Sequence, residues 1–158
     1  MVKDLIIEST ALTKAYGPHV ALDSLDIKIE KGSTGLLGPN GAGKSTFLKT
    51  ILGLIQLTSG EGKVLGLDIR TQGNQIRQHI GYMPEYEALN PNMDAIHQVK
   101  YSGELIGMNP NVALQRAHQA LDYVGLGEQR YREVSSFSTG MKQATKLACA
   151  LIHDPELI

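Results

Sequence analysis

The N-terminal part of the chain alternates between apolar and polar residues with the period of two that is typical of strands. Residues 5–7 and 11–12 are largely apolar, and residues 26–30 read Asp-Ile-Lys-Ile-Glu, a strict alternation. Because one face of such a strand is buried and the other meets water, the pattern predicts two half-buried antiparallel strands. Gly17-Pro18 supplies the turn between them.

Farther along the chain, the pattern changes from strand to helix and back. Residues 34–37 (Thr-Gly-Leu-Leu) form a short apolar run, which predicts a central strand buried on both faces. Residues 47–55 place apolar side chains at i, i+1, i+4, i+5 and i+8, which predicts a helix with one wide apolar stripe. Gly60 and Gly62 are predicted to end that helical region, and residues 63–66 to form an edge strand. A helical turn is predicted at 76–79, followed by a second buried strand at 80–83 that Pro84 ends.

From about Asn90 to His153, the pattern is helical throughout. Asn109-Pro110 predicts a helix start, with asparagine as the N-cap and proline in the first helical position. Gly125 predicts the stop of that helix. A last helix is expected from Ser138 to about Ile152, after which the apolar residues 156–158 begin another element.

The composition describes an ordinary globular domain. The chain has 158 residues, 42% of them hydrophobic, enough for a buried core. A formal net charge of -1 argues against a nucleic-acid partner, because no basic cluster dominates. Cys149 is the only cysteine, so no internal disulfide can form, and we expect it to be inert core in a reducing compartment.

No stretch is apolar and long enough for a signal peptide or a membrane span, so the sequence predicts a soluble, cytoplasmic protein. Any role at a membrane then needs a partner. The histidines show no metal-ligand spacing and are interpreted as surface or packing residues: His19, His79, His97, His118 and His153.

The residues with the clearest chemistry form a phosphate-binding loop of the pattern Gly-x4-Gly-Lys-Ser. It consists of Gly38, Pro39, Asn40, Gly41, Ala42, Gly43, Lys44, Ser45 and Thr46. Glycines allow the backbone N–H groups to converge on an anion, helped by the positive end of the following helix. We expect Lys44 to reach the β- and γ-phosphates and the Ser45 hydroxyl to coordinate Mg²⁺. A chance glycine-rich turn is the alternative, but the predicted strand before the loop and helix after it favour the nucleotide site.

Four further segments separate the kinds of phosphate-loop protein. They are the loop sequence Gly-Pro-Asn-Gly-Ala-Gly-Lys-Ser-Thr, Tyr16 about twenty residues ahead of it, residues 80–85 (Ile-Gly-Tyr-Met-Pro-Glu) and residues 136–143 (Ser-Phe-Ser-Thr-Gly-Met-Lys-Gln). Their order and spacing are those of one family. On these residues, over essentially the whole chain, the sequence resembles the ATP-binding domain of ABC transporters. No Asn-Lys-x-Asp guanine-reading segment is present, which argues against a GTPase.

The resemblance implies a set of site residues and partners. Tyr16 is placed to stack on adenine, and Glu85 stands at the Q-loop, where it joins Ser45 as a candidate Mg²⁺ ligand. The signature residues Ser138, Thr139, Gly140 and Met141 are placed to face the ATP held by a second copy, in a head-to-tail dimer. The implied cofactors are ATP and Mg²⁺. The implied membrane partners are transmembrane permease subunits that hold the protein at the inner face of the cell membrane.

Each of these residues also has an ordinary interpretation. Tyr16 can be an aromatic at a strand edge, Glu85 a polar residue in a turn, and Ser138 simply the N-cap of a helix. For Ser138 the two interpretations, helix N-cap and signature residue, are compatible, since a capped helix N-terminus can also face a phosphate.

The sequence departs from the common family pattern at four positions. Glu85 stands where glutamine is usual, Thr139 replaces a glycine, and Met141 replaces a glutamine, all of which resemble a branch that includes multidrug, sodium and polysaccharide exporters. A carboxylate at Glu85 can still bind Mg²⁺ but adds negative charge beside the γ-phosphate. Ala144 stands where arginine is usual, and nothing in the sequence explains it.

The resemblance also implies that the Walker B aspartate, the catalytic glutamate and the switch histidine would follow Ile158. We therefore expect a chain that is truncated before the Walker B strand, that binds nucleotide, that does not hydrolyse it at a useful rate, and that exposes an apolar sheet edge. Poor stability or self-association should follow.

The expected fold is α/β: a P-loop core with a parallel sheet, an N-terminal antiparallel β-subdomain and a helical subdomain that carries the signature, with the C-terminal part missing. The expected division is 1–88 for the β-subdomain and first part of the core, 89–153 for the helical subdomain, and 154–158 for the start of the Walker B strand. The leading function is the ATPase of a membrane transporter, with export as the expected direction. Two alternatives stay open: a non-transport ATPase of the same family in translation or DNA maintenance, and a regulatory nucleotide-binding module that never hydrolyses ATP.

Overall fold

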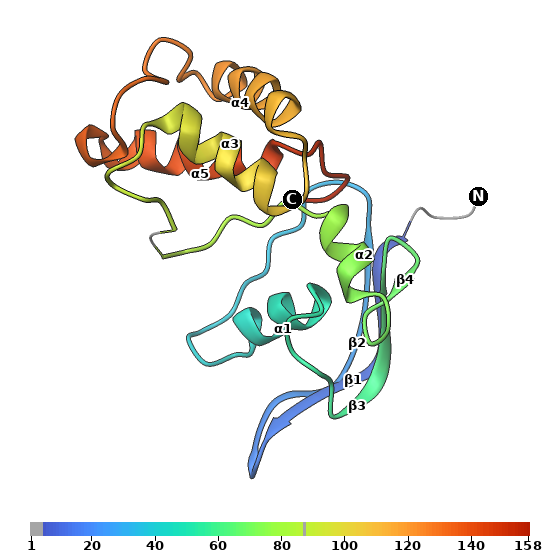
Figure 1. Ribbon diagram of the computed structural model, residues 1–158. Helices are drawn as coiled ribbons and strands as arrows, with labels where there is room; N and C mark the ends of the chain where they lie inside the picture. Colours follow the sequence, from blue (N-terminus) through green and yellow to red (C-terminus); the bar gives the residue numbers. More distant parts are fainter. Residues whose placement is uncertain (1–4, 87) are drawn as a thin grey trace. The chain divides into compact units, whose positions relative to one another are not determined.

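The computed structural model describes residues 5–86 and 88–158, which fall into two compact units (Figure 1). The units are residues 1–77 and 78–158. The subdomain boundaries inferred from the family resemblance stay a prediction. The elements of the first unit, with α2 at its boundary, are β1 (Leu5–Tyr16), β2 (His19–Glu30), α1 (Lys44–Ile51), β3 (Ser59–Val64), β4 (Leu67–Asp68) and α2 (Gly73–Gln78).

The predicted antiparallel pair at the start of the chain is confirmed and is longer than the pattern indicated. β1 and β2 pair antiparallel, and Tyr16 opposite His19 closes the hairpin over Gly17-Pro18. The alternation in β2 has the expected physical effect, since Leu25, Ile27 and Ile29 are half-buried while the polar residues between them are exposed. This hairpin is one side of a four-stranded sheet of order β2-β1-β3-β4.

The predicted edge strand at 63–66 is wrong in two respects. β3 runs from Ser59 to Val64 and lies inside the sheet, paired antiparallel with β1 on one side and with β4 on the other. Gly60 therefore belongs to a strand and does not end the preceding helix. A Cβ at Gly60 would overlap the Ala11 carbonyl oxygen, so the glycine permits the close strand approach.

The helix after the phosphate loop ends earlier than its apolar stripe predicted. α1 stops at Ile51, and Gly53 takes a φ of 65°. The Gly53 N–H donates to the Thr50 carbonyl and the Leu54 N–H to the Lys49 carbonyl, both at 2.9 Å, which is a Schellman motif. The periodic pattern continues to Ile55, but the left-handed glycine ends the helix.

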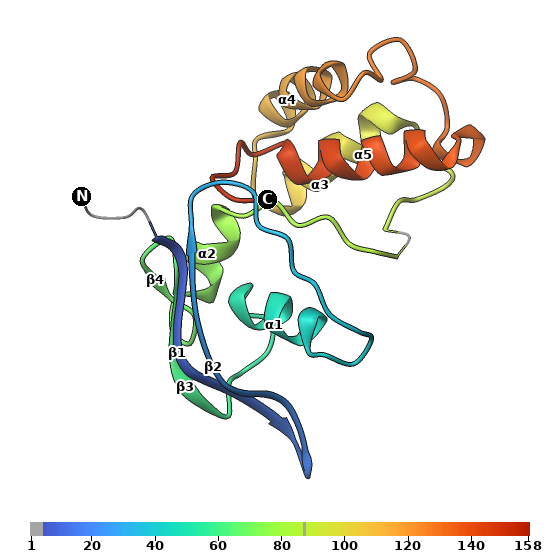
Figure 2. The ribbon, with the colours of Figure 1, turned by 180° about the vertical axis from the view of Figure 1, so that it is seen from behind.

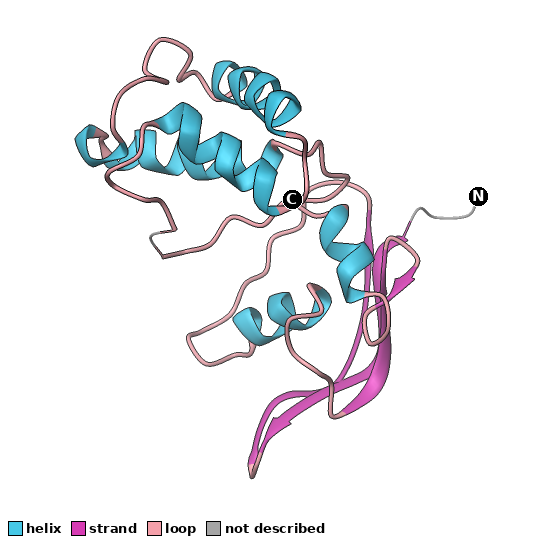
Figure 3. Cartoon of the chain, viewed as in Figure 1, coloured by secondary structure: helices cyan, strands magenta, loops and turns pink. Residues whose placement is uncertain are grey.

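The two short apolar runs that predicted buried central strands do not form strands. Residues 34–37 belong to the loop drawn before α1 (Figure 3), and the Leu37 side chain is 94% exposed. Of residues 80–83, only Ile80 pairs, in an isolated parallel bridge with Leu157. A strand exists only when a neighbouring strand accepts and donates its hydrogen bonds, and the described residues place none beside 34–37. The expected parallel sheet is therefore reduced to one bridge.

The second unit is helical, as predicted, but not throughout. Residues 124–138 contain only a short 3-10 helix, and the rest of that stretch is loop. α3 and α5 lie side by side in Figures 1 and 2, and α4 packs on both. The buried residues at their centre include Ile96, Val99, Leu121, Phe137 and Ile152. The elements are α3 (Ala95–Leu105), α4 (Pro110–Tyr123), η1 (Val134–Ser136) and α5 (Thr139–Leu151).

The predicted helix signals in this unit are confirmed by their hydrogen bonds. The Asn109 side chain accepts from the Asn111 N–H at 3.0 Å, with Pro110 as the first residue of α4. Gly125 takes a φ of 77° and ends that helix in a second Schellman motif, in which the Leu126 N–H donates to the Leu121 carbonyl at 2.8 Å. Leu126 and Leu121 are both buried, which is the apolar contact that accompanies this motif.

Candidate functional site

The phosphate loop lies in the first unit, between the irregular segment 31–37 and α1. Gly41 and Gly43 both have a φ of 85°, which a side chain with a Cβ rarely adopts. A Cβ at Gly43 would also overlap the Ala21 carbonyl oxygen on β2. The loop thus passes so close to β2 that only glycine fits at this position, and residues 38–42 remain open to solvent.

The N-terminus of α1 is free to bind an anion. Its N-cap is Gly43, so no side chain accepts a hydrogen bond from the first turn, and the first turn carries no acidic residue. The N–H groups of Lys44, Ser45 and Thr46 have no carbonyl partner within the helix, because the ladder begins with the Phe47 N–H donating to Gly43 at 2.8 Å. Helix dipole and open N–H groups together favour a phosphate here.

Lys44 folds back over the loop. Its ammonium donates to the carbonyl oxygens of Gly38 at 2.6 Å and Pro39 at 2.7 Å. The partial negative charge of these carbonyl oxygens stabilises the Lys44 ammonium, as the full charge of a bound anion would. The Lys44 ammonium is therefore held at the loop backbone. This cation and the open N–H groups of α1 are both donors of the kind that phosphates accept.

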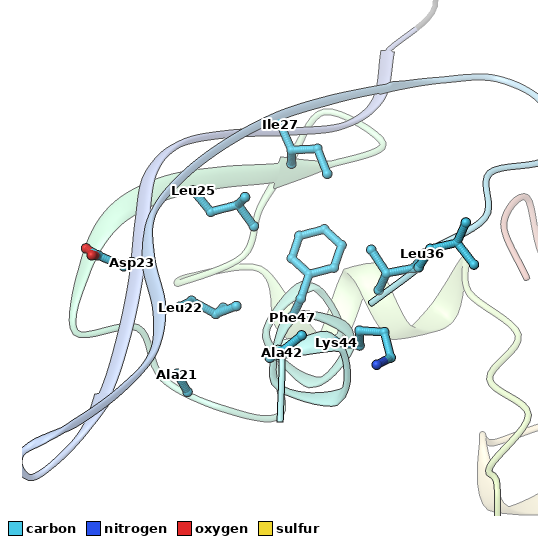
Figure 4. A pocket seen from close by; sticks show the side chains of 11 residues that line it. Ala21, Leu22, Asp23, Leu25, Ile27, Leu36, Ala42, Lys44 and Phe47 are labelled. Carbon is cyan, nitrogen blue, oxygen red and sulfur yellow. The ribbon is translucent and has the colours of Figure 1, made fainter. Parts of the chain in front are cut away.

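A pocket of about 230 Å³ adjoins the loop on its inner side (Figure 4). The side chains of Leu22, Leu25, Ile27 and Phe47 point toward its centre, between β2 and α1. These walls are apolar, and the phosphate-loop residues Ala42, Gly43 and Lys44 line the rest of the pocket's edge next to the loop. The loop therefore has an exposed side, at residues 38–42, and a side that adjoins this pocket.

Tyr16 ends β1 at the hairpin turn, 47% exposed, and the Lys14 ammonium lies 4.7 Å from the centre of its ring. In the described residues, no ring contact or hydrogen bond joins Tyr16 to the phosphate loop. An exposed aromatic face is what adenine stacking requires, so the placement is compatible with both interpretations of this residue.

Glu85 lies in the second unit, in a segment without regular structure. Its side chain is exposed, and its backbone carbonyl accepts a hydrogen bond from Lys146 of α5. The sequence motifs assign no role to Lys146. The signal that could have found it is a lysine inside the helix predicted from 138 to 152, next to positions that face the core.

The signature residues form the start of α5. Ser138 is its N-cap, and the hydroxyl oxygen accepts from the Met141 N–H at 3.3 Å. Ser138, Thr139 and Gly140 are exposed, and a Cβ at Gly140 would meet nothing closer than 4.0 Å. Met141 is different, because it is half-buried and packs against the helical core. The part of the signature that is open to a partner is therefore residues 138–140.

The model of the ABC transporter family matches residues 22–158, most of the chain. The chain belongs to the ABC transporter family. It is 37% identical over 154 residues to the linearmycin resistance ATP-binding protein LnrL of Bacillus subtilis, covering 97% of this chain and 50% of the relative. It is 34% identical over 154 residues to the Nod factor export ATP-binding protein I of Cupriavidus metallidurans, covering 97% of this chain and 51% of the relative. The chain thus spans about half the length of these curated relatives.

The fold agrees with that of solved ABC ATPase domains. The structure of cbiO1 from Clostridium perfringens, part of the ABC transporter complex cbiONQ, superposes with a TM-score of 0.84 at 23% identity, over 98% of this chain and 64% of that chain. The α/β fold class expected from the sequence, with its N-terminal antiparallel sheet and its helical subdomain, is therefore confirmed.

Three further observations concern the rest of this ABC protein. Burial raises the pKa of the Cys149 thiol, so the reactive thiolate is disfavoured. Among the described residues, no cluster of three or more His, Cys, Asp or Glu side chains could hold a metal ion. None of the helices within 5–86 and 88–158 is long and apolar enough to cross a bilayer.

Proposed function

We propose that this chain is the ATP-binding part of an ABC transporter, which couples ATP binding and hydrolysis to the export of a substrate. The observation that carries the proposal is the uncapped N-terminus of α1 beside the Lys44 ammonium, in a chain of this family. Backbone N–H groups and a side-chain cation, the two kinds of donor that bind phosphate, are thus supplied by one loop and the helix after it.

The residues present fit ATP and Mg²⁺ by their donor chemistry. The loop N–H groups and Lys44 would hold the phosphates, and the exposed Tyr16 ring would receive the adenine. The oxygens of Ser45 and Glu85 are the hard ligands that Mg²⁺ prefers. When bound, Mg²⁺ neutralises charge that develops on the phosphates. The task of the chain's own residues is to hold and orient the nucleotide.

The exposure of part of the signature supports the proposed head-to-tail assembly. Ser138, Thr139 and Gly140 lie open at the N-terminus of α5, where a phosphate carried by a second copy could dock head-to-tail. Permease subunits in the membrane would supply the substrate path, with this chain on the cytoplasmic face. Support for export comes from the relatives, one named for antibiotic resistance and one for Nod factor export.

Hydrolysis is proposed to need residues beyond those of this chain. None of residues 1–158 matches the family's catalytic glutamate or switch histidine, and Glu156 stands ahead of the position that the resemblance gives the glutamate. The chain should therefore bind ATP without turning it over.

The test is an ATP titration by calorimetry, with a phosphate-release assay on the same samples. Lys44→Ala is expected to weaken ATP binding about tenfold or more, since it removes charged hydrogen-bond donors from the site. Lys49→Ala, an exposed lysine in the last turn of the same helix, is the matched control and should bind ATP normally. ATP binding that is indifferent to Lys44→Ala contradicts the proposed site. Mg²⁺-dependent phosphate release that Lys44→Ala abolishes contradicts the proposed lack of turnover.

A further inference from the structure

Lys146 is a charged side chain in the interior of the second unit. It lies on α5 and is 5% exposed. Its ammonium donates to three successive backbone carbonyls, those of Tyr86 at 2.8 Å and of Pro84 and Glu85 at 3.4 Å each. Burying an ammonium is costly unless its N–H groups are hydrogen-bonded. A methionine would fill the same space without that cost, so packing alone does not account for a lysine here.

Among the described residues, the segment that Lys146 contacts is held by the hydrogen bonds from this side chain. Of the described residues between Gly81 and Asn90, none lies in a helix or strand, and Glu85 and Tyr86 are exposed. Within 82–86, the recorded hydrogen bonds are those from Lys146. The three protons of the ammonium match three converging carbonyl oxygens, which fixes the backbone on both sides of Glu85.

Two further contacts place this segment along α5 and the residues just after it. The His153 Nε2 lies 3.2 Å from the Ile80 carbonyl oxygen. Gly81 packs so closely on the Ala150 carbonyl that a Cβ would overlap it. Lys146 and Ala150 lie four residues apart on α5, and His153 lies two residues past its last residue. As the chain advances from 80 to 86, its contacts move back from 153 to 146, so the segment runs antiparallel to the helix.

We propose that Lys146 is a positioning residue that fastens residues 84–86, and with them Glu85, to the helix that begins at the signature. Two turns separate Lys146 from Ser138–Gly140 on the same rigid helix. A shift or rotation of α5, such as docking of a partner at the signature would cause, moves the ammonium and therefore the carbonyls around Glu85. One side chain thus couples the signature segment to the Q-loop segment. The role of Glu85 in this coupling rests on the proposed function; the mechanical link does not.

The mechanical link is tested by limited chymotrypsin digestion of the nucleotide-free chain. Cleavage after Tyr86 reports on the held segment, and cleavage after Tyr131, an exposed tyrosine in the 124–138 loop, is the internal reference. Lys146→Met is expected to raise the Tyr86 rate relative to the Tyr131 rate about tenfold, since it removes charged donors but keeps the volume and helix propensity. Arg116→Met, an exposed cation on α4, should leave the ratio unchanged. An unchanged ratio in Lys146→Met, or equal acceleration at both tyrosines, would overturn the proposal, because the lysine then has no local effect.

The link to nucleotide binding is tested by ATP titrations with and without Mg²⁺. Lys146→Met should reduce the gain in ATP affinity that Mg²⁺ provides about threefold or more, and leave Mg²⁺-free affinity, which the phosphate loop sets, unchanged. In a Glu85→Gln background, Lys146→Met should add little further loss, since the two changes act on one interaction. If the natural chain binds no ATP, the proposed function fails while the digestion still decides the link. If it binds ATP and the Mg²⁺ gain is unaffected by Lys146→Met, the coupling through Glu85 is refuted.

Discussion

At the scale of single residues, Gly43 combines two constraints that are usually separate. Its φ of 85° is a left-handed conformation, and the place where a Cβ would go is occupied by the Ala21 carbonyl oxygen. Gly41 has the same φ of 85° but open space around it. The pair therefore separates the conformational cost of a side chain from the cost of steric overlap with β2.

We predict that Gly43→Ala destabilises the chain more than Gly41→Ala does. The conformational strain is shared, and the overlap with β2 adds about 1–3 kcal/mol, because the backbone must move apart to accept the methyl group. Urea denaturation followed by circular dichroism measures both variants. Equal losses of unfolding free energy would show that the loop can shift away from β2 without cost.

At the scale of secondary-structure elements, the signals that the sequence showed clearly were the local ones. Asn109-Pro110 and Gly125 mark the two ends of α4 as expected, because caps act through one or two backbone hydrogen bonds between residues that are close in sequence. Gly53 acts in the same way, although the apolar stripe that predicts the helix continues past it to Ile55. Here a single left-handed glycine outweighed the periodic pattern.

The strands were harder to predict because a strand depends on its neighbours. Residues 34–37 and 80–83 have the composition of buried strands, yet only Ile80 pairs, and only with Leu157. Composition shows that a segment can be buried, but hydrogen bonds to an adjacent strand decide whether it becomes a strand. The same limit applies to Lys146, whose carbonyl partners lie about sixty residues away in sequence.

The contact between the end of α5 and Ile80 predicts a dependence of stability on pH. Burial lowers the pKa of His153 below its ordinary value of 6.5, while a hydrogen bond to the Ile80 carbonyl and the nearby Asp154 partly oppose this. In the window below 6.5, the unfolded chain therefore binds more protons than the folded chain. The free energy of unfolding should fall as the pH drops through this window, and be fully present above it.

Urea titrations at pH 7.5 and at lower pH values down to 5.0 test this expectation. His153→Gln is the matched variant, since its amide N–H₂ can still donate toward the Ile80 carbonyl but does not titrate. His79, which lies 2.8 Å from Glu156, is kept in both proteins. The prediction fails if both proteins lose stability equally as the pH falls.

At the scale of the whole molecule, the exposed apolar surface of the first unit stands out. Leu37 is 94% exposed and Leu36 is 41% exposed, in the same irregular segment that leads into the phosphate loop. Both also line the apolar pocket between β2 and α1. A neighbouring pocket and an exposed leucine pair make a contiguous apolar region, which another chain can cover.

We predict that the purified chain self-associates with rising concentration, and that Leu37→Ser weakens this association. The physical reason is that the Leu37 side chain loses most of its contact with water when a second molecule covers it, which is worth up to about 2 kcal/mol per leucine. Leu105→Ser is the matched control, because Leu105 is also well exposed, at 68%, but belongs to α3 in the second unit and does not line this pocket. Sedimentation velocity over a range of concentrations gives the measurement. If both substitutions weaken association equally, the association comes from exposed leucines in general and not from this region. If the chain stays monomeric at all concentrations, the prediction is wrong, because exposed apolar residues do not always drive assembly.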